Sequence, residues 1–128
     1  MVSLDLGEES EELEKGHSNV GISLLKSFFI LEPPILLPMT FGKDIVNEGD
    51  YGQLVCTVLR GDPPFSFTWS MQGDVVHSEP GLTTSQIGGR VSMLMITSVG
   101  HRHSGQYTCT VSNTAGQASV LAELKVNG

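Results

Sequence analysis

Apolar and polar residues alternate along much of this chain after residue 33, with the period of two that is typical of β-strands. The alternation is strictest over 65–70, where Ser or Thr separates Phe65, Phe67 and Trp69. Turn residues interrupt the pattern at short intervals. It predicts strands over 35–39, 45–46, 53–59, 65–70, 83–87, 90–96, 106–112 and 117–126, and 75–76 is compatible with a further short strand. Without helical periodicity, the chain is predicted to be an all-β sandwich.

The same period assigns each side chain to one face of its sheet, because successive residues of a strand point to opposite sides. If Cys56 points into the core, Val55 and Thr57 point outward, and by the same parity Met93 and Met95 point outward beside Leu94. The inward set is expected to form the core: Leu54, Cys56, Val58, Phe65, Phe67, Trp69, Leu94, Ile96, Tyr107, Cys109, Val111, Ala118, Val120, Ala122 and Leu124. This core is large enough for one independent domain.

The two cysteines and the single tryptophan follow a recognisable spacing. Trp69 comes thirteen positions after Cys56, and Tyr107 precedes Cys109 by two. Together with Ser92-x-Leu94-x-Ile96-x-x-Val99 and His103-Ser104-Gly105-x-Tyr107-x-Cys109, the pattern resembles the immunoglobulin superfamily, intermediate (I-set) type, over about residues 33–127. That resemblance implies an immunoglobulin-like β-sandwich of two antiparallel sheets with Greek-key connections.

The resemblance also implies roles for single residues. Cys56 and Cys109 would form a disulfide between the sheets, Trp69 would pack on it, and Leu94 and Tyr107 would complete the core. In the strand letters of this fold, A, B, E and D are 35–39, 53–59, 90–96 and 83–87, and they share one sheet. A disulfide places the protein in an oxidising compartment.

Three segments carry a narrower resemblance: Gly61-Asp62-Pro63-Pro64 with Trp69, 98–105, and Ser112-Asn113-Thr114-Ala115-Gly116. They look like the variable Ig domains of arthropod Down syndrome cell adhesion molecule (Dscam) proteins, including chelicerate-type forms. This resemblance implies homophilic cell recognition. In many I-set domains an Asp, often paired with an Arg, stands where this chain has His103, so that ion pair is not expected here.

The first part of the chain differs from the rest in charge. Residues 1–32 hold the acids Asp5, Glu8, Glu9, Glu11, Glu12, Glu14 and Glu32 against Lys15 and Lys26. We expect 1–32 to be a disordered acidic leader or to lie outside the mature domain, and 33–128 to be the Ig-like domain. No secretion signal or membrane-spanning segment is recognisable, so we expect a fragment of a larger cell-surface protein, membrane-bound only through other parts of its parent.

Several chemistries are not supported by the pattern. The near-neutral charge of 33–128 does not favour nucleic-acid binding. No acid completes a Ser104–His motif and no phosphate loop is present, so we expect no enzyme, small-molecule substrate or cofactor. His101 and His103 are interpreted as exposed turn residues rather than metal ligands, and no metal site is expected.

The outward residues of the A-B-E-D sheet suggest how the domain acts. Val55, Thr57, Met93 and Met95 are expected to form one partly apolar patch, free of N-glycan sequons, whereas the opposite sheet shows mainly Ser and Thr. Exposed apolar patches mark contacts. We therefore expect an extracellular adhesion module whose partner is another copy of itself on an apposed cell.

Two other functions are compatible with the sequence. One is a structural I-set spacer of an intracellular muscle-type protein, in which the cysteines would stay reduced. The other is a heterophilic receptor domain that binds through the B–C loop, Leu59 to Phe65, and the F–G turn, Asn113 to Gly116. The redox state of the cysteines discriminates the first from adhesion, and mutation of the face against the loops discriminates the second.

Overall fold

The structure is a computed structural model that describes residues 31–128, of which Glu32–Gly128 form one compact unit. The expected leader therefore lies almost entirely outside the described residues and stays a prediction. The strands are β1 (Ile35–Leu36), β2 (Val46–Asn47), β3 (Gly52–Arg60), β4 (Ser66–Met71), β5 (Asp74–Val75), β6 (Leu82–Ile87), β7 (Val91–Ile96), β8 (Gly105–Asn113), β9 (Gly116–Leu124) and β10 (Val126–Asn127), with a 3₁₀ turn, η1 (His101–His103), between β7 and β8.

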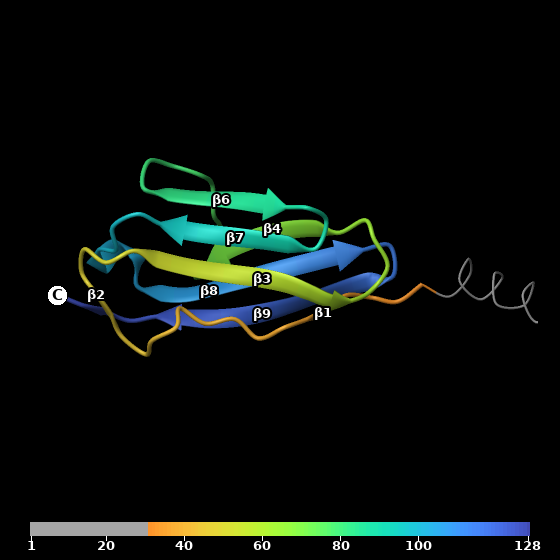
Figure 1. Cartoon of the computed structure of the whole chain (residues 1–128), viewed down its shortest axis with the longest axis horizontal. Coiled ribbons are helices and arrows are strands. Elements are labelled where there is room, and N and C mark those ends of the chain that lie inside the picture. Colours follow the sequence, from red (N-terminus) through yellow and green to blue (C-terminus); the bar gives the residue numbers. More distant parts are fainter. Residues whose placement is uncertain (1–30) are drawn as a thin grey trace, which may run out of the picture. The chain divides into compact units, whose positions relative to one another are not determined.

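Two four-stranded sheets pack face to face (Figure 1). One has the strand order β1-β3-β7-β6, which is the A-B-E-D sheet, and the other has the order β5-β4-β8-β9. The pairs within each sheet are antiparallel. Since β3 and β4 follow each other in sequence but lie in opposite sheets, the chain crosses over as the predicted sandwich requires, and the predicted fold class is confirmed.

The first strand is shorter than the predicted 35–39. After Leu36 the register with β3 ends, and the last bond along this edge runs from the Leu37 N–H to the Thr57 carbonyl at 3.0 Å. Pro38 has no N–H to continue the ladder. The chain then changes sheet partner, because β2 pairs in parallel with β10 at the end of the other sheet. The predicted strand over 117–126 is likewise divided into β9 and β10.

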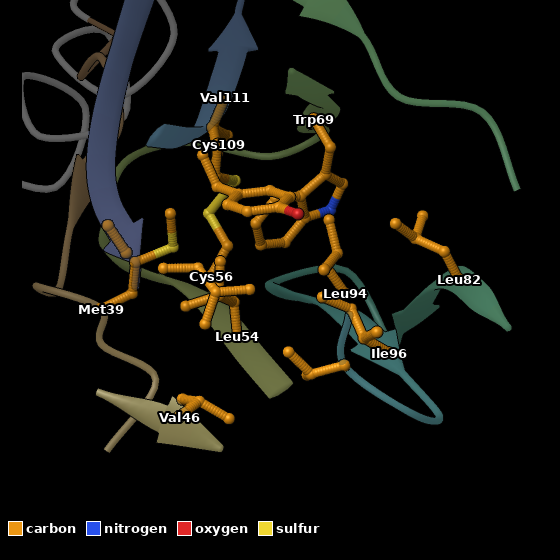
Figure 2. Close-up of a cluster of buried hydrophobic side chains, with 14 of the residues drawn as sticks. Met39, Val46, Leu54, Cys56, Trp69, Leu82, Leu94, Ile96, Cys109 and Val111 are labelled. Carbon is orange, nitrogen blue, oxygen red and sulfur yellow. A yellow bond between two sulfur atoms is a disulfide. The ribbon is translucent and has the colours of Figure 1, made fainter. Parts of the chain in front are cut away.

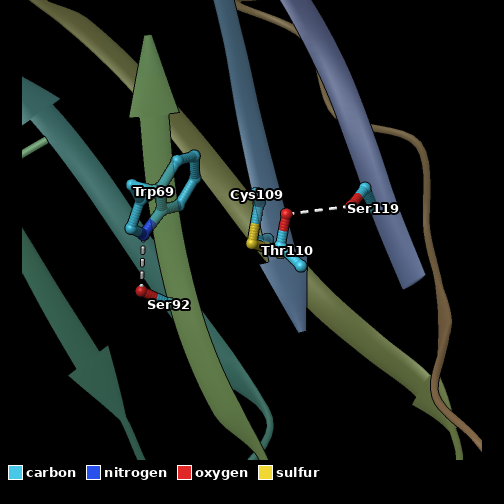
Figure 3. The surroundings of a disulfide bond; sticks show 6 residues. Trp69, Ser92, Cys109, Thr110 and Ser119 are labelled. Atoms are coloured by element: carbon cyan, nitrogen blue, oxygen red, sulfur yellow. Dashed lines mark hydrogen bonds between the residues drawn. A yellow bond between two sulfur atoms is a disulfide. The ribbon is translucent and has the colours of Figure 1, made fainter. Parts of the chain in front are cut away.

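The core lies between the sheets and follows the predicted parity (Figure 2). Cys56 and Cys109 are fully buried and joined by a disulfide, with their Cα atoms 6.4 Å apart, which confirms the expected bridge. Trp69 packs beside the bridge and its indole Nε1–H donates to the Ser92 hydroxyl at 2.9 Å (Figure 3). Phe67, Ala118 and Val120 are only partly buried, so the core is narrower at these positions than expected.

The turn between β7 and β8 contradicts one expectation. His101 is exposed as predicted, but His103 is 4% exposed. Its Nδ1 accepts the Gly100 N–H at 2.8 Å, and its backbone carbonyl accepts the hydroxyl of Tyr107. The expectation failed because η1 turns the imidazole back under the corner. Burial and the nearby Arg102 guanidinium lower the pKa of His103, and burial raises the pKa of Tyr107 to about 12.

At the opposite end of the domain, Asn113 links three segments. Its Nδ2 donates to the Glu32 carbonyl at 2.7 Å and to the Asp62 carbonyl at 2.9 Å. Its Oδ1 accepts the N–H groups of Ala115 and Gly116. The Glu32 and Asp62 backbones are also joined by the Asp62 N–H to the Glu32 carbonyl. Asn113 therefore fixes the β3–β4 and β8–β9 loops to the start of the domain.

Candidate protein-binding surface

The residues predicted to form a contact patch lie together on the outer face of the sheet β1-β3-β7-β6, here called the A-B-E-D face. Val55 of β3 is registered opposite Met93 of β7, and Met93 is opposite Ser85 of β6. Met95 follows two residues later and has Gln53 as its β3 neighbour. The prediction that Val55, Thr57, Met93 and Met95 share one face agrees with this register. All four side chains are half-buried by their neighbours rather than fully exposed.

The register arranges the A-B-E-D face into three rows that run across the strands. We name them after their β7 residue and list them from β3 to β6: the Val91 row is Thr57, Val91, Ile87; the Met93 row is Val55, Met93, Ser85; and the Met95 row is Gln53, Met95, Thr83. Neighbouring residues within a row are close enough to pack side chain on side chain. The face is thus a continuous surface with a β7 ridge of three apolar side chains.

The face is also larger and more apolar than the sequence patch. Ile87, at the β6 end of the Val91 row, is 55% exposed, and Leu59, the next outward residue of β3, is 56% exposed. None of the outward positions of β3, β6 and β7, from Gln53 to Met95, carries a charge. Continuing the alternation by one step along each predicted strand would have identified both residues from the sequence.

A shallow groove of about 510 Å³ borders this face on the β1 side. It forms where the chain leaves β3 after Leu37, and its floor includes outward residues of β3. The lining residues are Leu37, Pro38, Met39, Thr40, Phe41, Gly42, Tyr51, Gln53, Val55 and Thr57. Since Val55 and Thr57 belong to both, the groove extends the A-B-E-D face. The sequence analysis missed it, because it depends on where strand A changes sheets.

The outer face of the other sheet differs in chemistry. Thr68 is registered opposite Thr110, which is registered opposite Ser119, and the last two hydroxyls are hydrogen-bonded at 2.9 Å (Figure 3). The next row contains Ser70, Thr108 and Leu121. Its hydroxyl groups are satisfied by one another or by solvent, so this face offers less apolar area to a partner than the A-B-E-D face.

Among residues 31–128, no group of three or more His, Cys, Asp or Glu side chains is placed to hold a metal ion, and no helix is long and apolar enough to cross a membrane. Arg90, for which no acidic partner was expected, lies over the Phe65 ring at 5.3 Å and donates to the Gly61 carbonyl. The described charges therefore serve local contacts at the rim.

The disulfide, the tryptophan packed on it and the tyrosine at the corner define an immunoglobulin-like β-sandwich domain. The family profile described as "Immunoglobulin I-set domain" matches residues 40–126. The chain belongs to this family. The family is non-enzymatic, and no catalytic role follows from the fold.

The relatives carry adhesion names. The chain is 36% identical over 99 residues to "Cell adhesion molecule Dscam1" of Drosophila melanogaster, covering 77% of this chain and 5% of that protein. It is 36% identical to human "Cell adhesion molecule DSCAML1", covering 73% and 4%, and 32% identical to mouse "Contactin-6", covering 93% and 11%. The chain thus spans a small fraction of these relatives' length.

Solved structures agree with the fold. The "Dscam1 Ig7 domain, isoform 9" superposes with a TM-score of 0.70 at 36% identity, covering 74% of this chain and 100% of that one. The titin "I-band fragment I67-I69" has a TM-score of 0.64 at 28% identity, covering 74% and 32%. The expected resemblance to Dscam is confirmed, and the titin match shows how widely this sandwich is used.

Proposed function

We propose that this domain is an extracellular recognition module of a cell adhesion protein, and that it binds a second copy of itself on an apposed cell through the A-B-E-D face. The observation that carries the proposal is the uncharged face with its β7 ridge of Val91, Met93 and Met95. Two such faces can meet without burying an unpaired charge, which would cost several kcal/mol. The adhesion names of the relatives support the same class of function.

Methionine suits this contact. Its flexible, polarisable side chain adapts to an opposing surface, and apolar patches rimmed by polar residues mark protein contacts. The rim is charged: Lys43 and Asp50 lie 3.6 Å apart near the groove, and Arg90 lies at the end of β7. A weak contact of this kind becomes effective between cells because many copies act together.

Binding through the loops is less well supported. Asn113 fixes both the β3–β4 loop and the β8–β9 turn to Glu32 by backbone hydrogen bonds. Its side chain is committed to these bonds, and the turn itself is short. The intracellular spacer is favoured only by the likeness to titin domains, whereas the Cys56–Cys109 bridge supports an oxidising location.

The proposal is tested by sedimentation of Met95→Asp beside wild type. A charge at the centre of a self-contact should weaken association by about 2 kcal/mol or more, because it is buried there without a partner. Thr108→Asp is the matched control, since Thr108 is also half-buried and faces outward on the opposite sheet. Aggregation of beads that display each variant gives a second readout.

Melting curves of both variants establish that the fold is intact, because each substituted side chain already contacts solvent. Loss of association in Thr108→Asp with retention in Met95→Asp would assign the contact to the wrong sheet. Loss only in variants of Asn113 to Gly116 would instead favour the loop-binding receptor. A monomeric wild type in both assays would remove the homophilic proposal altogether.

A further inference from the structure

We infer that the two copies meet in antiparallel orientation about a two-fold axis that crosses the Met93 row. Met93 of one copy then faces Met93 of the other, and Met95 faces the other copy's Val91. This inference rests on the proposed function, because it assigns the geometry of the same self-contact. It follows from how the chemistry of the three rows is ordered along the strands.

A two-fold contact places the same surface on both partners, so its pattern must match itself after rotation. An axis across the strands at the Met93 row leaves each strand over its counterpart and exchanges the two outer rows. On β7, Val91 and Met95 change places, and both are apolar. On β3, Gln53 and Thr57 change places, and both carry uncharged hydrogen-bonding groups.

The central row is compatible with the axis. Val55 meets Val55 and Met93 meets Met93, so the middle of the contact is apolar on both strands. The outer β6 positions bring the exposed Ile87 over the methyl group of Thr83, while Ser85 meets Ser85. The pattern is therefore nearly palindromic about Met93, with apolar residues meeting apolar residues on the ridge and hydrogen-bonding residues meeting each other beside it.

The other face-to-face two-fold arrangement fits less well. An axis parallel to the strands keeps each row over itself and exchanges β3 with β7. Met95 would then cover Gln53 of the other copy, and Val91 would cover Thr57. Burial under Met95 would take the Gln53 amide out of water, although its Oε1 is now supplied only by the Tyr51 hydroxyl at 3.2 Å. Desolvating an amide without a new partner disfavours this arrangement.

Charge complementation tests which residues face each other. We expect each single charge, in Met93→Asp, Met93→Lys, Met95→Asp and Val91→Lys, to weaken self-association by about 30-fold or more. Mixing Met95→Asp with Val91→Lys should recover at least ten-fold, because a salt-bridged pair forms at the contact. Mixing Met93→Asp with Met93→Lys should recover by the same mechanism. Sedimentation of the mixtures against each variant alone measures the recovery.

The control pairs separate this geometry from the proposed function. Mixing Met95→Asp with Gln53→Lys should recover little in the antiparallel arrangement but strongly in the strand-parallel one. If Met95→Asp weakens association and only the Gln53→Lys mixture recovers it, the antiparallel inference is wrong while the homophilic face stands. If none of the face variants changes association, the proposed function itself fails.

A second measurement serves if a charged variant melts early. Facing positions of packed sheets are about 10 Å apart, too far for a direct disulfide but within reach of a short bismaleimide spacer. Met93→Cys alone should cross-link to a dimer. Met95→Cys should cross-link when mixed with Val91→Cys and much less on its own. Cross-linking of Met95→Cys alone at the yield of Met93→Cys would overturn the placement of the axis.

Discussion

The Trp69 indole is held in the core by a side-chain hydrogen bond to Ser92, with Nε1 and Oγ 2.9 Å apart. Trp69 lies on β4 and Ser92 on β7, so the bond joins the two sheets beside the disulfide (Figure 3). Ser92 is the inward neighbour of Met93, and Cys56 is its β3 partner. The same strand therefore presents one side chain to the core tryptophan and the next to the A-B-E-D face.

We expect Ser92→Ala to lower the free energy of unfolding by about 1–3 kcal/mol, because it leaves the buried indole N–H without an acceptor. Chemical denaturation followed by tryptophan fluorescence measures the change. Thr110→Val is the matched control, since it removes a solvent-facing hydroxyl bond to Ser119 and keeps the β-branched shape. Equal losses in both variants would mean that the Trp69 bond contributes nothing special.

The disulfide should contribute a large part of the stability. Cross-linking residues that are 53 positions apart stabilises by about 4 kcal/mol on the chain-entropy model. We expect the variant with both Cys56→Ala and Cys109→Ala to unfold at a much lower denaturant concentration than wild type. Mass spectrometry of secreted wild-type protein should find two hydrogens fewer than the reduced mass; free thiols there would argue against the extracellular location.

His103 should make stability fall in mild acid. Its pKa is lowered in the folded state by burial and by Arg102, with Glu79 acting weakly in the opposite sense. As pH falls below the ordinary value of 6.5, the unfolded chain takes up a proton that the folded chain resists. Stability is therefore full above that pH and declines toward the lowered pKa, by at most about 1.4 kcal/mol per pH unit.

His103→Gln provides the control for that decline, because it removes the titrating group and keeps a polar side chain. The pH dependence of denaturant midpoints between about 4 and 7 should be steeper in wild type than in this variant. NMR should find the Gly100 amide, which donates to Nδ1 in the neutral form, exchanging faster in acid. Parallel curves for the two proteins would show that other groups cause the acid response.

Asn113 can be tested by separating its donors from its acceptor. Asn113→Ala removes the bonds to the Glu32 and Asp62 carbonyls and exposes the turn amides, so we expect a loss of about 1–2 kcal/mol. Asn113→Asp keeps an acceptor for Ala115 and Gly116 but loses both donors. Amide exchange should therefore rise at those two residues in the Ala variant alone, while both variants loosen the β3–β4 loop.

The local pattern of the chain was sufficient for the fold. Alternation around Cys56, Trp69 and Cys109 determined which side chains enter the core, because side-chain direction along a strand is a property of successive residues. The same parity placed Met93 and Met95 on the outer side of β7. The spacing of Tyr107 and Cys109 identified the family, and the structure confirmed the disulfide that this resemblance implied.

Tertiary structure decided what parity could not. The order of strands in the sheet determines which outward residues share a row, so the near-palindrome about Met93 became visible only with β3 and β6 in register beside β7. The groove exists because the chain leaves β3 after Leu37 to pair β2 with β10. His103 is buried because a short 3₁₀ turn, which follows no period of two, folds its ring under the corner. Local sequence thus set the direction of each side chain, and packing between distant segments set its neighbours and its exposure.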